Sequence, residues 1–294
     1  MTAVVAGAPS RLEPVRRFGR QFATIPGGVA GLVILVAVTA LALASPLFIH
    51  SSDLSVVNAS GPSLSPPSWR YWLGTDQPGR SVLLLVIWGA RPSLAIGVIA
   101  TLCTVCIGAV IGLLAGHLGG LSGRALMAVT DWFIALPQLP LAIALAAVLG
   151  QGDASITIAI AVTSWTTTAR IVRAQTLAVE ARPFVERAHA LGAGHRQVVL
   201  RHVLPNVAPL ILVSSTLTVA SAILSETTLA FLGLGNPTDV SWGAMLNQAV
   251  GQGAVTRGAW WYLLPPGVAI LLVVLGFTLC GRAIEAVLNP RAVR

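Results

Sequence analysis

Lysine is absent from this 294-residue chain, and charged residues of all kinds make up only 10% of it. The common phosphate-binding loop of nucleotide hydrolases requires a Gly-Lys pair followed by Ser or Thr. We therefore expect no ATP bound by that route, no cofactor held by this chain, and a partner for any ATP-driven work. An ordinary soluble domain contains about 25% charged residues, whereas 55% of this chain is hydrophobic. The composition predicts a protein embedded in a membrane.

All eighteen basic residues are arginines, and the formal net charge is +8. A nucleic-acid-binding chain would gather its basic residues into a stripe interleaved with aromatics, but these arginines are dispersed. In a membrane protein such an excess belongs to cytoplasmic loops that face anionic lipid. We therefore expect lipid contacts and no nucleic-acid partner.

Only three cysteines are present, and all lie inside apolar runs (Cys103, Cys106 and Cys280). A CxxC pair such as Cys103 and Cys106 also occurs in redox and metal sites. The simpler interpretation is two small apolar residues on a buried helix. We expect no metal site.

Six apolar runs are long enough to cross a hydrocarbon core of about 30 Å. They predict an all-α, polytopic membrane protein with transmembrane helices at residues 28–49, 93–116, 125–149, 154–172, 207–232 and 260–287. Pro137 and Pro140 are expected to kink the third helix. Residues 50–92, which are polar and rich in proline, are expected to form an irregular loop outside the membrane.

The distribution of arginine predicts the orientation. With the N-terminus inside, fourteen arginines fall in cytoplasmic segments and four fall outside. By the positive-inside rule, both termini lie in the cytoplasm. The expected parts are an N-terminal arm (1–27), a first span (28–49), an extracytoplasmic loop (50–92), a core of five spans (93–290) with a long cytoplasmic loop (173–206), and a C-terminal tail (291–294).

The longest polar stretch after the N-terminal third is residues 180–206, which we call the central segment. Two short helices are predicted within it. Pro183 suits the first position of a helix because its missing N–H is not needed there. Gly192 is placed to cap that helix in the left-handed conformation. The second helix, over about residues 195–202, is expected to end at Leu204 and Pro205.

The first of these helices would carry a narrow apolar stripe. Phe184, Ala188 and Leu191 recur at i, i+4 and i+7. Such a helix either rests on lipid headgroups or fills a groove on another protein. The pattern alone leaves both alternatives open.

The central segment resembles the EAA signature of permease subunits in ATP-binding-cassette importers. That signature reads Glu-Ala-Ala, three residues, Gly, nine residues, and Ile-x-Leu-Pro. The matching positions are Glu186, Ala188, Gly192, Leu204 and Pro205. Arg187 replaces the first alanine and His202 replaces the isoleucine. The ending RHVLPN is similar to the form found in the peptide and nickel branch.

Further segments are similar to the C-type permease subunit of that branch. They are residues 72–94, where Ser81 stands for the usual aspartate, Asp131 with Leu136 and Pro137, residues 225–237, and residues 241–246. The resemblance covers about residues 20–289, with its segments in the family's order.

This resemblance implies a type I importer permease fold in a bacterial cytoplasmic membrane. It implies a heterodimer with a second six-span permease, two cytoplasmic ATP-binding subunits that hold ATP and Mg, and an extracytoplasmic solute-binding protein. The chain would be a non-catalytic transport subunit for di- or oligopeptides. Importers of nickel complexes and of glutathione belong to the same branch.

The resemblance also implies a docking surface for the ATP-binding subunits. The family's motif places Glu186, Ala188 and Gly192 on it. Nearby arginines would offer paired contacts to carboxylates on the partner. The expected coupling residues are Glu186, Arg187, Ala188, Gly192, Arg196, Arg201, Leu204 and Pro205.

Ionisable residues inside spans need a reason, because each costs roughly 2.5–3.5 kcal/mol at the membrane centre. Asp131 and Glu226 are therefore candidates for lining or gating the translocation path, with Pro137 and Thr227 beside them in sequence. The alternative is a structural role at a helix end or a membrane interface.

Two alternatives from other classes of protein have some support in the sequence. Residues 120–123 spell GLSG, the serine motif of rhomboid proteases, but a serine protease needs a histidine base beside Ser122. Three of the five histidines lie in the central segment instead. An ion-coupled secondary transporter would use Asp131 and Glu226 as proton sites, but it gives no reason for the patterned central segment.

Overall fold

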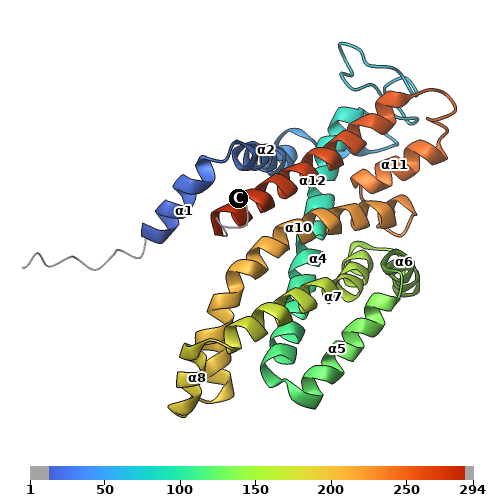
Figure 1. The fold of residues 1–294 in the computed structure, drawn as a ribbon. Coiled ribbons are helices and arrows are strands. Elements are labelled where there is room, and N and C mark those ends of the chain that lie inside the picture. The colour runs from blue at the N-terminus through green and yellow to red at the C-terminus, as the bar shows by residue number, and fades with distance from the viewer. Residues whose placement is uncertain (1–12, 289–294) are drawn as a thin grey trace, which may run out of the picture.

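The computed structural model describes residues 13–288, and its regular structure over that range is helical (Figure 1). The elements are α1 (Glu13–Ala23), α2 (Pro26–Phe48), α3 (Ser51–Leu54), α4 (Val82–Leu118), α5 (Gly120–Ala135), α6 (Gln138–Leu149), α7 (Asp153–Glu180), α8 (Pro183–Ala190), α9 (His195–Val198), the π-helical turn η1 (Val199–Val203), α10 (Leu204–Phe231), α11 (Trp242–Gly251) and α12 (Trp260–Leu288). The start of the predicted N-terminal arm and the whole predicted C-terminal tail lie outside the described residues.

The prediction of an all-helical membrane protein is confirmed, but the count of six spans is not. Four stretches are long and apolar enough to cross a membrane: α2, α4, the continuous run His195–Phe231, and α12. The bent pair of α5 and α6 makes a fifth if it is counted as one span. Helix α7 is 28 residues long but is not among these stretches, because threonines and arginines interrupt its apolar residues.

Helix α4 begins eleven residues earlier than predicted and runs for 37 residues through Pro92. Residues 82–90 are apolar, and Val82 and Leu85 are 0% and 1% exposed in a core with α11 and α12. This burial stabilises the helix around a proline that costs one backbone hydrogen bond. The loop predicted over residues 50–92 therefore ends at Ser81.

The cysteines of α4 also differ from the prediction. Cys103 and Cys106 are exposed on the helix surface, and only Cys280 is buried. Cys103 and Cys106 therefore lie on a side of α4 that the rest of the described chain does not cover.

The third predicted span is broken rather than kinked. Helices α5 and α6 meet at an angle of 90°. Leu136, between them, is extended with φ −83° and ψ 135°, because a following proline disfavours the helical conformation. Helix α7, in turn, extends to Glu180, so the first part of the loop predicted over residues 173–206 is helical.

Helices α4 and α7 run parallel and touch along a seam of glycines at Gly108, Gly112 and Gly116 of α4. A Cβ atom on Gly112 would lie 2.5 Å from the carbonyl oxygen of Ala169. On Gly108 and Gly116 it would lie 2.6 Å from a threonine Cβ of α7. Small residues at such a seam let helix backbones approach closely within a membrane. The seam sets the C-terminal ends of both helices side by side.

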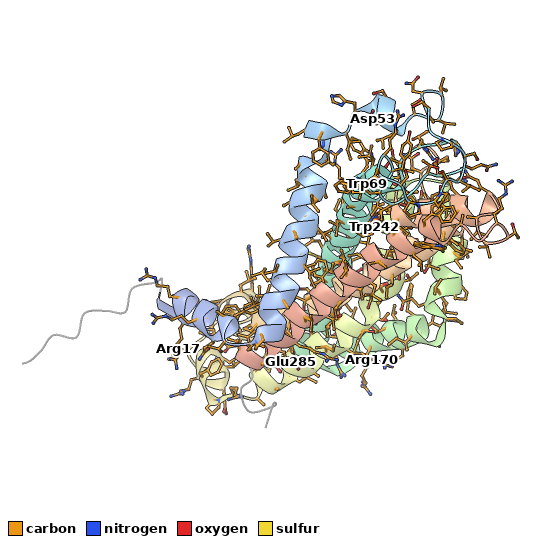
Figure 2. The ribbon with its side chains drawn as sticks, turned by 90° about the horizontal axis from the view of Figure 1, so that it is seen from above. Arg17, Asp53, Trp69, Arg170, Trp242 and Glu285 are labelled. Atoms are coloured by element: carbon orange, nitrogen blue, oxygen red, sulfur yellow. The ribbon has the colours of Figure 1, made fainter. Side chains whose placement is uncertain are left out.

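The central segment and the proline-rich loop lie at opposite ends of the molecule. Figure 1 shows α8 at one end of the long helices and the loop after α3, with α11, at the other. Figure 2 shows Asp53 and Trp69 at the latter end, and Arg17 and Glu285 toward the opposite one. The central segment is therefore remote from the proline-rich loop.

A buried ion pair holds the loop end together. The Nε atom of Arg80 lies 2.7 Å from Oδ2 of Asp76, and the two side chains are 7% and 0% exposed. Arg80 also donates to the carbonyl of Leu54 at 3.1 Å and to Oε1 of Gln248 at 3.2 Å. One guanidinium thus connects the loop, α3 and α11. In the sequence, Arg80 contributes only to the arginine distribution that predicts the orientation, and no local pattern indicates this ion pair.

We predict that Gly112→Ala destabilises the protein, because the new methyl group meets backbone of α7. Overpacking of this kind costs about 1–3 kcal/mol. The matched control is Gly267→Ala in α12, where an added Cβ has no neighbour within 4 Å. Thermal unfolding of the purified protein in detergent should show a lower Tm for Gly112→Ala alone. Equal Tm values for both variants would contradict the close contact of α4 and α7 at Gly112.

Candidate functional site

The first helix of the central segment forms as predicted. Helix α8 begins at Pro183, and Gly192 follows its end with φ +84°. The amide of Gly192 donates to the carbonyl of His189 at 2.9 Å, and the amide of Ala193 donates to that of Ala188 at 3.0 Å. These two bonds are the Schellman motif, which favours glycine at the left-handed position. The predicted role of Gly192 as a cap is confirmed.

The second helix differs from the prediction, because Pro205 does not end it. Helix α9 passes through η1 directly into α10, and the amide of Leu204 donates to the carbonyl of Val199, five residues earlier. A π turn before a proline widens the helix, and Pro205 stands in the first turn of α10, where no N–H is needed. Residues from His195 to Phe231 form one continuous helical run.

Valines anchor the central segment to the spans. Val185 of α8, Val198 of α9 and Val203 of η1 are all 0% exposed. They pack in one cluster with Leu113 of α4 and Val172 of α7. The inward face of α8 is therefore Val185, which the sequence analysis did not single out.

The predicted apolar stripe faces away from the rest of the chain, as both alternatives for it require. Leu191 is 88% exposed and Phe184 is 38% exposed. With Ala188 they line a groove of about 330 Å³ between α8 and η1. The other lining residues are Arg187, Gly192, Ala193, Gln197 and His202. A Cβ on Gly192 would meet nothing within 4 Å in this chain. An exposed apolar groove with polar edges is typical of a surface that another protein covers.

The structure gathers some of the expected coupling residues and separates others. Arg187, Ala188 and Gly192 line the groove. Leu204 is half-buried against the valine cluster. The remaining expected residues are exposed on the same segment outside the groove: Glu186, Arg196, Arg201 and Pro205. Their contacts with a partner stay a prediction.

A chain of polar side chains, which the sequence analysis missed, ties the central segment to two spans. Nδ1 of His117 lies 2.6 Å from Oε1 of Glu180, and Nε2 of His117 lies 3.0 Å from Nδ1 of His195. With Glu180 ionised, each neutral imidazole donates one N–H along the chain. His117 therefore links the ends of α4 and α7 to the start of α9. His117 and His195 are 78 residues apart, so no local spacing rule joins them.

The two intramembrane carboxylates have different surroundings. Oδ1 of Asp131 lies 2.7 Å from Nη2 of Arg170, and both side chains are more than half exposed. Glu226 is 0% exposed, beside Ser93, Thr227 and Ser241. The structure therefore does not bring Asp131 and Glu226 together. That these residues, Pro137 and Thr227 line or gate a path stays a prediction.

Ser122 has no catalytic partner among the described residues. Its hydroxyl donates to the carbonyl of Gly119 at 3.2 Å, in the first turn of α5. The nearby His117 is bonded to Glu180 and His195 instead. The geometry gives no support to the serine-protease alternative.

Long apolar helices with an exposed groove at one end are the build of a membrane subunit that docks onto another protein. Residues 108–294 match the family model described as "Binding-protein-dependent transport system inner membrane component". The chain belongs to this family, and the resemblance to importer permeases is confirmed.

Relatives extend the similarity over nearly the whole chain. The chain is 36% identical to the di/tripeptide transport system permease protein of Pseudomonas aeruginosa, over 95% of this chain and 93% of the relative. It is 36% identical to the oligopeptide transport system permease protein of Bacillus subtilis, over 90% and 85%. It is 34% identical to the glutathione transport system permease protein of Pectobacterium atrosepticum, over 94% and 89%.

We predict that the bond between His117 and His195 holds the central segment in place. His195→Asn keeps an N–H close to the position of Nδ1, whereas His195→Gln does not. Loss of one hydrogen bond costs about 0.5–1.5 kcal/mol, so His195→Gln should raise the rate of tryptic cleavage within the central segment several-fold. His195→Asn should be cleaved at the original rate. Equal rates in the two variants would contradict the prediction.

Proposed function

We propose that this chain is a permease subunit of an ATP-driven importer of di- or oligopeptides and forms half of the translocation path. The observation that carries the proposal is the groove beside Gly192, formed by a family signature and open to a partner. Membership of the transport family and the names of the peptide-permease relatives support it. The chain acts as a transport subunit, and ATP hydrolysis takes place on its partners.

The proposed fold is the six-span type I importer permease, with α7 as the span that hydropathy misses. At 1.5 Å per residue, its 28 residues extend about 42 Å. Four of the threonines that lower its hydropathy are buried, at positions 163, 166, 168 and 176. The hydroxyls of Thr163 and Thr176 donate to carbonyls one turn earlier. Such side chains are compatible with a membrane because the protein, and not lipid, surrounds them.

The proposed orientation places the central segment in the cytoplasm and the proline-rich loop outside, as the arginine distribution favours. The proposed partners are a second permease, two ATP-binding subunits at the groove, and a solute-binding protein outside. At the outer end Trp69 and Trp72 are 99% and 70% exposed. Aromatic side chains of this kind are enriched in protein interfaces, so these two are candidates for contact with the binding protein.

The geometry suggests how movement of the ATP-binding subunits reaches the path. Helix α9 is continuous with α10, and only Ala181 and Arg182 separate α8 from α7. Helix α4 has no covalent link to the central segment nearby, and instead contacts it through His117 and the valine cluster. A pull on α8 and α9 would thus move three spans together.

We predict that Gly192→Asp abolishes docking while membrane insertion persists. At φ +84° the backbone of an aspartate is strained, and its side chain fills the open space beside the groove. The matched control is Gly194→Asp, because Gly194 caps α9 with φ −69° and Asp is a favourable N-cap. Each tagged variant is purified from its native membrane in mild detergent. The ATP-binding subunits should co-purify with the original chain and with Gly194→Asp, but not with Gly192→Asp. Their retention on Gly192→Asp would count against the groove.

We predict that di- and oligopeptides, presented by the binding protein, stimulate ATP hydrolysis by the reconstituted complex. Glutathione and a nickel chelate are the alternatives to compare, and a stronger response to either would replace peptides as the substrate. Transport that follows an imposed proton gradient and not ATP would overturn the proposed ATP-driven importer.

We predict that Ser122→Ala leaves transport unchanged. Complete loss of activity in this variant would revive the protease alternative.

A further inference from the structure

A second groove lies away from the central segment, on helices that are long and apolar enough to cross a membrane. It lies between α2, α4 and α12 and has a volume of about 720 Å³. Its walls are apolar along most of their length, with Ala42 and Leu43 from α2, Val98 and Ile99 from α4, and Phe277 from α12. It is distant in sequence and in fold from the central segment.

The groove has the length of one leaflet of a bilayer. Its lining along α4 extends from Trp88 to Ile99, which is about 16 Å at 1.5 Å per residue. Half of a hydrocarbon core of about 30 Å is about 15 Å. By the orientation proposed above, Trp88 lies at the outer surface and Ile99 near the midplane. A single acyl chain of the outer leaflet would fit along this wall.

Two opposite charges stand at the outer mouth of the groove. The guanidinium of Arg91 lies 4.7 Å from the ring centre of Trp88, and it makes no hydrogen bond or ion pair among the described side chains. Asp239 lines the same groove. Its Oδ2 accepts from Asn236 at 2.9 Å, and the carboxylate of Asp153 lies beside it. The mouth thus offers a free cation for a phosphate and a negative region for an ammonium group.

A polar pocket continues the groove outward. It has a volume of about 660 Å³ and shares Trp88, Asp239 and Val240 with the groove. Polar side chains of Arg80, Gln248 and Gln252 line it together with Asp239, so the headgroup of a lipid in the groove would lie among polar groups.

We propose that the groove and the polar pocket together bind an aminophospholipid of the outer leaflet, of the phosphatidylethanolamine type. Its acyl chain lies along α4, its phosphate contacts Arg91, and its primary ammonium donates to Asp239. A phosphatidylcholine headgroup has no N–H to donate. A phosphatidylglycerol headgroup brings no cation to the negative region around Asp239. A transmembrane helix of a partner would cover the apolar wall but leave Arg91 without a charged partner.

The test uses the purified complex in nanodiscs that contain phospholipid with a photoreactive acyl chain. Phosphatidylethanolamine, phosphatidylcholine and phosphatidylglycerol probes are compared at equal concentration, and the labelled residues are mapped by mass spectrometry. Labelling by the phosphatidylethanolamine probe should be concentrated at residues 39–43 and 94–99 and exceed that by the other probes about five-fold, since a charge-assisted hydrogen bond contributes about this much or more. Equal labelling by all three would overturn the proposal and show boundary lipid only.

Variants separate the two halves of the headgroup. Asp239→Asn should remove the preference for phosphatidylethanolamine and leave labelling by phosphatidylglycerol at least as strong. Arg91→Gln should lower labelling by all three probes, because the phosphate is common to them. The matched control is Arg70→Gln, since Arg70 also lies over an aromatic ring, that of Tyr71 at 5.7 Å, on the same loop end. If either Asp239→Asn or Arg91→Gln leaves the labelling unchanged, the proposal is overturned.

A photoreactive amino acid at Val98 tests for another occupant. In the complex it should form adducts with lipid. Adducts with a second polypeptide instead would show that a protein partner fills the groove, and would overturn the proposal. This result is independent of whether the complex imports peptides.

Discussion

The close approach of α4 and α7 is the constraint on which the rest of the structure depends. Gly108, Gly112 and Gly116 contribute no side chain to the interface, so α4 approaches backbone of α7 at Gly112 and threonine side chains of α7 at Gly108 and Gly116. The C-terminal ends of α4 and α7 therefore lie together. Only then do His117 and Glu180 meet, and only then does the valine cluster have both helices to pack against. The position of α8, and with it the groove, therefore depends on the contact between α4 and α7.

The two ends of the molecule are held by different forces. At one end, apolar packing of valines holds the central segment against α4 and α7, and the hydrogen bonds of His117 fix the position of α9. At the other end, one buried guanidinium joins the proline-rich loop to α3 and α11. Removing one partner of a buried ion pair costs about 3–5 kcal/mol, so this guanidinium contributes strongly to the stability of the loop.

Local chemistry was readable from the sequence, and long-range packing was not. Pro183 and Gly192 start and cap α8 as predicted, because both effects involve only neighbouring backbone. Pro92 was expected to lie in a loop, yet burial of the residues before it keeps it inside α4. Pro205 was expected to end one short helix, yet a π turn makes that helix continuous with α10. The burial of Val185 and the meeting of His117 with His195 depend on how spans pack, which spacing along the chain does not encode. Family resemblance located the central segment, and the structure showed which of its faces is open.

The most direct measurement of the central claim is site-specific photo-crosslinking from Leu191, which is 88% exposed at the groove. The same photoreactive amino acid at Leu43, which is 74% exposed on α2, is the control. The account predicts that Leu191 in native membranes forms one main adduct, with a polypeptide that contains a phosphate-binding loop, and that Leu43 forms none with it. Lipid adducts alone from Leu191, matching those from Leu43, would contradict the account and make the central segment a surface that rests on the membrane.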